Sequence, residues 1–236
     1  MRMIAAAGFD FAMIDTEHSS FDLEVVSGMC QMARAAGLVP VVRPYSHDGP
    51  LLRRLLGLGA MGLMCPGVES RTQVEALRRV LAEPAEGPAV VDYEAGMSGA
   101  PAAAYFRENV QLIVQCETRL GVERIDEILD GGGVDVVEVG RTDLSHSLGH
   151  PDERRHPEVL AALDTITASC QRHGVAVGAM CDSAEDAEDL LRRGVRWLMY
   201  SSDTGILMRT YAQGAAVLRA AAETVVPVAA APATSR

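Results

Sequence analysis

Short apolar runs alternate with amphipathic segments along almost the whole chain. The runs are rich in Val, Leu, Ile and Met, and polar or glycine residues bound them on both sides. Continuous apolar runs of this kind are typical of strands that a parallel sheet buries on both faces. The pattern predicts strands at residues 9–14, 39–42, 61–64, 111–116, 134–139, 175–180 and 197–200.

The segments between these runs have the periodicity and the boundary residues of helices. Gly8, Gly37, Gly59 and Gly174 follow predicted helices as stop signals, and Ser183 begins one as its N-cap. Helices are predicted at residues 2–7, 22–36, 50–58, 72–82, 101–108, 121–130, 157–173, 183–193 and 205–222. Strands that alternate with helices form a parallel sheet with right-handed crossovers.

The alternation predicts a single α/β domain over residues 1–225, built as a TIM (β/α)8-type barrel. Seven predicted strands are one fewer than the eight of such a barrel. Because the chain begins inside a predicted helix, we expect the first strand of the barrel to be missing from this chain. Residues 83–101 are predicted as a long loop, residues 141–156 as an exposed polar loop, and residues 226–236 as a disordered tail.

Charged or hydroxyl side chains follow most of the predicted strands directly. In a (β/α)8 barrel the carboxyl ends of the strands form the face that carries the active site. The residues at these positions are Asp15, Glu17, His18, Arg43, Glu69, Glu117, Asp143, Ser201 and Asp203. We therefore expect an active site at this face of the barrel.

Two of these carboxylates, Glu117 and Asp143, follow buried strands in the same way and are the first candidates for metal ligands. Two carboxylates completed by water and substrate oxygens suit a hard octahedral cation such as Mg²⁺ or Mn²⁺. Gln115 lies two residues before Glu117, so both side chains point to one face of the strand and the amide can support a bound substrate. The alternative is that each carboxylate forms a salt bridge with Arg119 or Arg141.

Arg43 and His18 are the candidates for catalysis at the same face. A guanidinium facing an oxo-acid stabilises a developing enolate oxygen, and a carboxylate–imidazole pair is a usable general base near neutral pH. Asp15 and Glu17 are both close enough in sequence to orient His18, and the sequence does not distinguish them. The alternatives are a rim ion pair for Arg43 and a surface position for His18.

Several other kinds of site find no support in the sequence. The chain contains no lysine, since every basic residue is arginine, and this excludes an aldolase that works through a lysine imine. No Gly-x-Gly-x-x-Gly motif follows a strand, so a dinucleotide site is unsupported. His146, His150 and His156 fit no metal-binding spacing and are expected to be solvated loop residues.

Composition and charge narrow the function further. The formal net charge is −11, which argues against binding to nucleic acid or to an anionic membrane surface. Five cysteines without a pairing pattern indicate reduced thiols, and no apolar stretch has the length of a membrane span. We therefore expect a cytoplasmic protein whose partner is a small molecule.

Five segments together resemble one family, the HpcH/HpaI aldolase/citrate lyase family, and most closely its metal-dependent pyruvate aldolases. They are AGFDFAMIDTEH (7–18), VVRP (41–44), LGAMGLMCPGVE (58–69), VQCET (114–118) and VGRTDLSHSLG (139–149). The resemblance implies a barrel of the phosphoenolpyruvate/pyruvate superfamily. It also implies a lyase that reversibly cleaves a 4-hydroxy-2-oxo acid to pyruvate and an aldehyde through a metal-stabilised enolate.

The resemblance assigns roles to the candidate residues. Glu117 and Asp143 would hold the divalent metal, Mg²⁺ or Mn²⁺ with Co²⁺ as a further candidate, and Arg43 would stabilise the enolate. His18, paired with Asp15, would move protons. The backbone around Thr142 and Asp143 would bind the carboxylate of the oxo-acid substrate. The family's last helix is often exchanged between protomers, so a homo-oligomer based on dimers, such as a hexamer, is expected.

The chain departs from the family pattern in three places. A strand and a helix that precede Ala7 in the family are absent, Gly140-Arg141 stands where the family has Gly-Pro, and residues 82–91 replace a Tyr-Pro-Pro-x-Gly-x-Arg-Gly loop. Two alternatives therefore stay open. The same metal–enolate site could serve another oxo-acid condensation, a decarboxylation or a citrate-lyase-like cleavage, or the barrel could bind a metabolite without catalysis.

Overall fold

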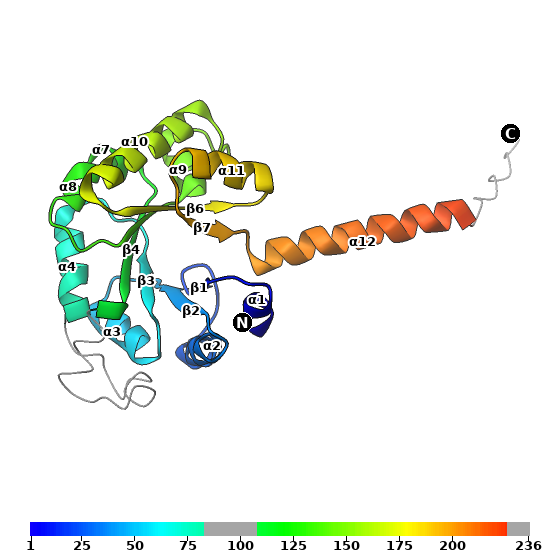
Figure 1. Cartoon of the computed structure of the whole chain (residues 1–236), viewed down its shortest axis with the longest axis horizontal. Coiled ribbons are helices and arrows are strands. Elements are labelled where there is room, and N and C mark those ends of the chain that lie inside the picture. Colours follow the sequence, from blue (N-terminus) through cyan, green and yellow to red (C-terminus); the bar gives the residue numbers. More distant parts are fainter. Residues whose placement is uncertain (83–107, 226–236) are drawn as a thin grey trace, which may run out of the picture.

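A computed structural model describes residues 1–82 and 108–225 of the chain. Helices and strands alternate along almost the whole of these two ranges (Figure 1). The elements are α1 (Arg2–Ala6), β1 (Phe11–Asp15), α2 (Leu23–Ala35), β2 (Val39–Arg43), α3 (Gly49–Gly57), β3 (Gly62–Cys65), α4 (Arg71–Ala82), β4 (Gln111–Cys116), α7 (Arg119–Glu123), α8 (Ile125–Leu129), β5 (Val136–Val139), α9 (Arg141–Leu148), α10 (Pro157–His173), β6 (Ala176–Cys181), α11 (Ala184–Arg192), β7 (Trp197–Tyr200) and α12 (Asp203–Val225).

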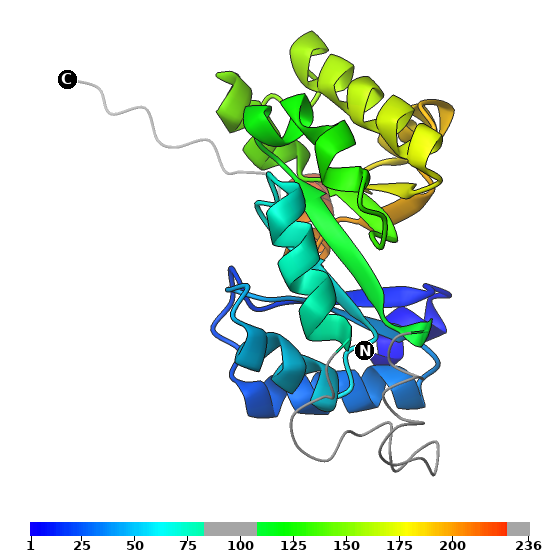
Figure 2. The same cartoon turned by 90° about the vertical axis from the view of Figure 1, so that its left-hand side faces the viewer.

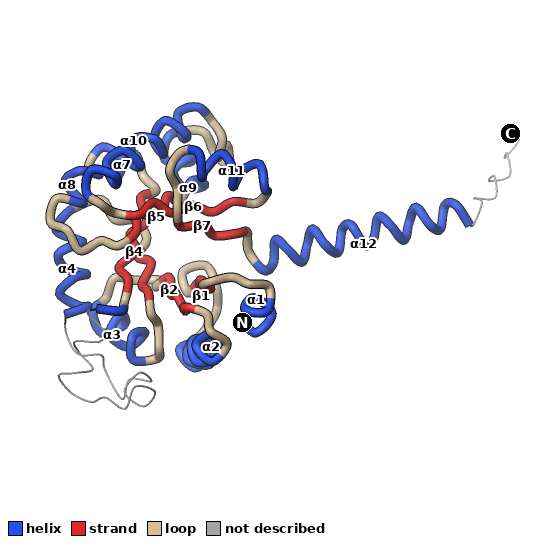
Figure 3. The backbone as a smooth tube through the Cα atoms, in the orientation of Figure 1, coloured by secondary structure: helices blue, strands red, loops and turns tan. Residues whose placement is uncertain are grey.

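The seven strands form one parallel sheet in the order of the sequence, from β1 to β7. The sheet curls on itself, and the helices lie outside it (Figure 3). In the side view, α2 and α10 lie at opposite ends of the molecule with the strands between them (Figure 2). Among the described strands β1 and β7 do not pair, so the sheet is an open seven-stranded barrel. The predicted strands and the incomplete (β/α)8 architecture are confirmed.

Both faces of the curled sheet are covered, and the buried core forms two main clusters beside a small third one of Ala12, Ala33 and Leu38. The larger one lies between the strands and the surrounding helices, with Leu52, Leu55 and Leu163 fully buried in it. The smaller one fills the barrel interior and is built on side chains from the inward faces of the strands. Its buried members are Val41, Met64, Ile113 and Val136.

Aromatic stacking inside the barrel connects the two unpaired edge strands. Phe11 of β1 and Trp197 of β7 lie with their ring centroids 4.2 Å apart and their planes at 19°. Gly178 makes room for the indole, because a Cβ there would lie 2.8 Å from Trp197 Cε3. Side-chain packing therefore joins the edges where backbone hydrogen bonds do not.

The predicted exposed loop at residues 141–156 is wrong in its first half. Residues Arg141–Leu148 form helix α9, and Gly149 ends it with a φ of +91°. Ser145 and Leu144 are completely buried, and Arg141 is 4% exposed. The polar composition concealed a helix because two of its polar residues, Arg141 and Ser145, are buried, while Asp143, His146 and Ser147 are exposed.

Two other expectations about elements need comment. The helix expected at 121–130 is two short helices, α7 and α8, which meet at Arg124. The loop expected at 83–101, most of the short helix at 101–108 and the tail at 226–236 lie outside the described residues. The single domain over residues 1–225 stays a prediction.

Arg141 is held by a buried ion pair that ties the start of α9 to α11. Its Nη1 and Nη2 atoms lie 3.1 and 2.6 Å from the two carboxylate oxygens of Asp186, and Nη2 also donates to the Met180 carbonyl. The two side chains are only 3% and 11% exposed. The Nε atom of Arg141 is buried with no hydrogen-bond partner in the part of the chain that is described.

Helix α12 is the exception to this compact packing. It runs for 23 residues, none of them buried, and projects away from the barrel (Figure 1). Within the described ranges, no helix is long and apolar enough to cross a membrane.

Replacing Asp186 by Ala is expected to lower the free energy of unfolding by about 3–5 kcal/mol, because the Arg141 charge is then buried without its partner. Urea unfolding measures this. Glu188→Ala on the same helix is the matched control, since its ion pair with Arg192 is exposed and is expected to contribute little. Equal losses of unfolding free energy in the two variants would contradict a stabilising role for the buried pair. Adding Arg141→Met to Asp186→Ala removes the unpaired charge and is expected to restore stability.

Candidate active site

A cavity of about 300 Å³ opens at the carboxyl ends of the strands. Each of the seven strands contributes a lining residue, so the curled sheet itself shapes the cavity. His18, Arg43, Gln115, Thr142 and Asp143, all predicted from the sequence, line it. The face of the barrel that the sequence indicated is therefore the face that is hollowed.

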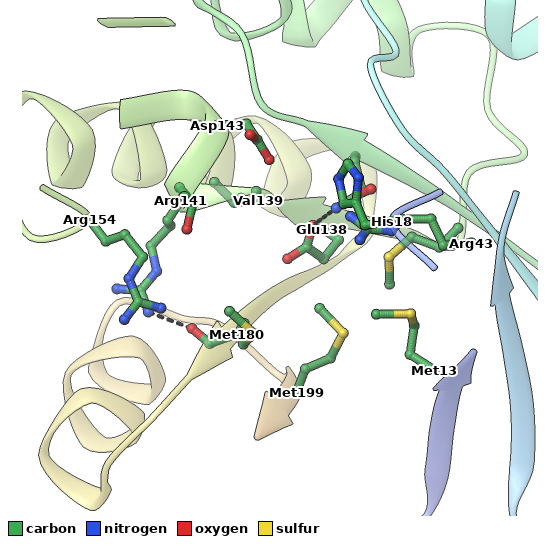
Figure 4. A pocket seen from close by; sticks show the side chains of 14 residues that line it. Met13, His18, Arg43, Glu138, Val139, Arg141, Asp143, Arg154, Met180 and Met199 are labelled. Atoms are coloured by element: carbon green, nitrogen blue, oxygen red, sulfur yellow. Dashed lines mark hydrogen bonds between the residues drawn. The ribbon is translucent and has the colours of Figure 1, made fainter. Parts of the chain in front are cut away.

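Four methionines form most of the apolar part of the lining, together with Val139. Met13, Met64, Met180 and Met199 come from β1, β3, β6 and β7, and Figure 4 shows Met13, Met180 and Met199 on one side of the cavity. Methionine side chains are flexible and polarisable, so they adapt to ligands of different shape. The sequence analysis did not single out these residues, because inside apolar runs they look like ordinary core.

Glu138 is a buried carboxylate in the middle of this lining, and the sequence analysis missed it. It is 2% exposed, and Gln115 Nε2 donates to its Oε2 at 2.7 Å. Burial raises the pKa of Glu138 to about 7, although the hydrogen bond from Gln115 opposes the shift. The one signal in the sequence was a charged residue inside an otherwise apolar strand.

Glu117 is held at the top of β4 by two close contacts. Its Oε1 accepts a hydrogen bond from the Gly67 N–H at 2.7 Å. Its Oε2 lies so close to Gly140 that a Cβ at that position would be 2.7 Å away, so only glycine fits there. Burial raises the pKa of Glu117 to about 7, the Gly67 hydrogen bond opposes this, and the nearby charge of Asp143 adds to it.

Asp143 lies in the first turn of α9, beside Thr142 on the cavity wall. The first N–H groups of a helix have no partner within the helix, and the helix dipole favours an anion there. Figure 4 shows the Asp143 carboxylate at the opposite side of the cavity from the methionines. This end of α9 can therefore bind a substrate carboxylate through its backbone.

The structure does not contain the salt bridges that were the alternative for the two carboxylates. Arg119 contacts Glu158 at 3.3 Å, and Arg141 is occupied by Asp186. Neither arginine has an ion pair with Glu117 or Asp143 among the described residues. Two neighbouring acids, of which Glu117 is partly buried and has no ion pair among the described residues, fit a cation better than a structural ion pair.

Arg43 forms an ion pair at the rim of the barrel, which was the alternative to a catalytic role, and it also lines the cavity. Its Nε and Nη2 atoms donate to the two oxygens of Asp15 at 3.0 and 2.6 Å, and Nε lies 3.3 Å from Glu17 Oε2. The side chain is 12% exposed. The bidentate contact fixes the plane of the guanidinium and so orients it toward the cavity.

His18 lines the cavity, but among the described residues its imidazole has no hydrogen bond to Asp15, the carboxylate that the resemblance implied. The Asp15 carboxylate binds Arg43. Its Oδ1 also accepts hydrogen bonds from the backbone N–H groups of Glu17 and His18, at 2.9 and 3.3 Å. The imidazole Nε2 lies 3.6 Å from Glu17 Oε2, and the His18 side chain as a whole is 64% exposed. Glu17 is therefore the carboxylate beside the ring, and Asp15 shapes the turn that carries it.

A separate cluster of possible metal ligands lies at the start of α10. Ligand atoms of His150, His156 and Glu158 lie within 4.8 Å of one another. The two imidazoles stack with centroids 3.4 Å apart, and His156 Nδ1 accepts the N–H of Glu158 as the cap of α10. These contacts give the cluster a structural role, so we do not assign the catalytic metal to it.

The chemistry and packing of Glu117 and Asp143 fit a hard divalent cation. Gly140 leaves space for the Glu117 carboxylate, and Gln115 Oε1, on the same face of the chain as Glu117, is buried with no hydrogen-bond partner among the described residues. The carboxylate oxygens of Glu117 and Asp143 are donors of the kind that Mg²⁺ and Mn²⁺ prefer.

Known proteins resemble this chain over most of its length. A 5-keto-4-deoxy-D-glucarate aldolase from Salmonella paratyphi C is 32% identical over 210 residues, which covers 86% of this chain and 81% of the relative. A hydroxypyruvate/pyruvate aldolase from Paraburkholderia phytofirmans is 33% identical over 222 residues, which covers 89% and 85%.

Solved structures agree with this relationship. An HpcH/HpaI aldolase from Desulfitobacterium hafniense superposes with a TM-score of 0.84 at 28% identity, over 92% of this chain and 86% of the other. The family model described as HpcH/HpaI aldolase/citrate lyase matches residues 1–210. The chain therefore belongs to the HpcH/HpaI aldolase/citrate lyase family.

Proposed function

We propose that this protein is a divalent-metal-dependent aldolase that reversibly cleaves a 4-hydroxy-2-oxo acid into a pyruvate-type oxo-acid and an aldehyde. The observation that carries the proposal is the Glu117 carboxylate, packed against Gly140 beside Asp143 and without an ion pair among the described residues. The absence of lysine from the chain leaves a metal rather than an imine to activate the oxo-acid.

Glu117 and Asp143 are the residues that would hold the metal, which supplies Lewis acidity for the oxo group when bound. Mg²⁺ and Mn²⁺ suit these oxygen donors, and Co²⁺ is a further candidate. The N–H groups at Thr142 and Asp143 bind the substrate carboxylate, because they lie at the start of α9 and on the cavity wall.

Arg43 stabilises the negative charge that develops on the oxo oxygen when C3 loses a proton. Asp15 holds the guanidinium in a fixed plane for this task, so Asp15 is a positioning residue. His18 moves protons between solvent and substrate, since its imidazole is half open to water and also lines the cavity. Glu17 is the carboxylate placed to orient the ring.

We also propose that the protein is a homo-oligomer in which α12 packs on a second copy of the chain. A helix of 23 residues with no buried side chain gains little stability from packing on its own barrel, and apolar residues lie along its length. Those exposed by 50% or more are Leu207, Met208, Tyr211, Val217, Leu218 and Val225. A dimer-based assembly such as a hexamer covers this surface.

The proposed location is the cytoplasm. All five cysteines are free and buried, as expected of a protein that does not depend on disulfides.

Purified protein is expected to exchange the C3 protons of pyruvate for deuterium in D₂O when Mg²⁺ or Mn²⁺ is present. Loss of the C3 proton needs no aldehyde, so the exchange tests the first half of the reaction alone. Mass spectrometry of the recovered pyruvate follows it. EDTA is expected to abolish the exchange and added metal to restore it. If Mg²⁺, Mn²⁺ and Co²⁺ all fail to support exchange, the proposed function is wrong.

Glu117→Gln is expected to slow this exchange by more than about 100-fold and to weaken metal binding, because the cation loses a charged ligand. Calorimetric titration with Mn²⁺ measures the binding independently of activity. Glu123→Gln, on the exposed face of α7, removes the same charge nearby and is expected to change neither quantity. Unchanged Mn²⁺ affinity in Glu117→Gln would remove Glu117 from the metal site.

The double variant Leu207→Glu/Leu218→Glu is expected to reduce the assembly to smaller species, because charges are then buried against the second copy. Light scattering after gel filtration measures the mass. Gln213→Glu places one charge at a polar position of the same helix and is the control. An unchanged mass in the double variant, or a monomeric wild type, would contradict the proposed role of α12.

A further inference from the structure

We propose that Glu138 and Gln115 form a binding site for a hydroxyl group on C3 of the oxo-acid, so that the preferred oxo-acid is a 3-hydroxy-2-oxo acid rather than pyruvate. The inference rests on the proposed function and adds its substrate class. Glu138 lies outside the set of residues to which the metal and the proton transfer were assigned.

The register of β4 and β5 places Glu138 directly beneath the proposed metal site. Gln115 pairs with Glu138 in the sheet, and side chains alternate between the two faces of a strand. Three levels follow inside the barrel. Ile113 lies with Val136 in the interior core, Gln115 with Glu138 above them, and Glu117 against Gly140 at the top. A ligand on the metal therefore has the Glu138 level below it.

One acceptor at this level, Gln115 Oε1, has no donor among the described residues. Gln115 donates to Glu138, and Gln115 Oε1 is buried with no partner in the described ranges. Arg43 commits Nε and Nη2 to Asp15, while Arg141 commits both Nη atoms to Asp186 and the Met180 carbonyl. Buried polar groups normally have hydrogen-bond partners, so the unpaired Gln115 Oε1 beside the Glu138 carboxylate indicates a ligand that donates.

The surroundings of Glu138 favour a hydroxyl over other substituents on C3 of the oxo-acid. The four methionines of the lining offer no donor, so a hydroxyl entering this part of the cavity finds its strong acceptor at Glu138. A methyl group in the same place leaves the carboxylate without that hydrogen bond. A second carboxylate on C3 is repelled by Glu138 when that residue is ionised. A neutral hydroxyl is the substituent that fits both the acceptors and the apolar walls.

The geometry assigns the hydroxyl to the oxo-acid and not to the aldehyde. The oxo-acid is the component fixed at Glu117 and Asp143, and Glu138 lies one residue pair below Glu117 in the barrel interior. Figure 4 shows Glu138 at the centre of the cavity, between His18 and Arg43 on one side and Arg141 and Arg154 on the other. The aldehyde arrives second and occupies the side that is still open to solvent.

The test compares deuterium exchange at C3 of hydroxypyruvate and of pyruvate, with Mg²⁺ and without any aldehyde. Wild-type protein is expected to have a higher kcat/KM for hydroxypyruvate. Glu138→Met extends the methionine lining and removes the acceptor, so the ratio of the two kcat/KM values is expected to fall by about ten- to hundredfold, chiefly through the KM for hydroxypyruvate. Glu138→Gln keeps a hydrogen-bonding group of the same shape and is expected to retain part of the preference.

Two controls separate this selectivity from loss of fold or of function. Glu185→Gln removes an 83% exposed carboxylate on α11 and is expected to leave the ratio unchanged. Thermal unfolding shows whether each variant is folded. A wild-type preference for pyruvate, or equal losses with both oxo-acids in Glu138→Met, would overturn the assignment of Glu138. Failure of wild-type protein to exchange either oxo-acid would overturn the proposed function itself.

Discussion

The parallel pairing of β4 with β5 is the constraint on which the rest of the site depends. Because Gln115 lies opposite Glu138 and the next inward pair is Glu117 and Gly140, one register decides the whole arrangement. A shift of β4 by one residue against β5 would turn the Gln115 and Glu117 side chains from the barrel interior to the helix layer. The absence of a side chain at Gly140 then lets the Glu117 carboxylate lie over β5, where Asp143 approaches it from the start of α9.

The start of α9 is in turn held by the buried pair of Arg141 and Asp186. The pair spans two helices and also contacts the carbonyl of Met180 at the end of β6. It therefore fixes the position of the helix end whose N–H groups face the cavity. Arg141 is one of the departures of this chain from its relatives, and it serves packing as well as charge. A neutral residue at position 141 would not need the Asp186 carboxylate of α11 as a partner.

The strands, their order and the active face were predictable from the sequence, because buried parallel strands are continuous apolar runs whose ends carry polar residues. Arg43, Gln115, Thr142 and Asp143 were predicted for the site and line the cavity. Helix α9 was not predicted, since Arg141 at its start is buried by a partner far away in sequence, Asp186. Glu138 was missed because one charged residue in an apolar strand does not reveal which way its side chain points.

The sequence by itself determined the periodicity of the elements, the family and the residue types at the strand ends, since these depend on local order along the chain. Only the tertiary structure decided which groups meet. It paired Asp15 with Arg43 and left Glu17 beside His18, although both acids precede the histidine closely. It also enclosed Glu138 among methionines from four strands. Contacts between distant segments depend on the curl and register of the sheet, which no short stretch of sequence encodes.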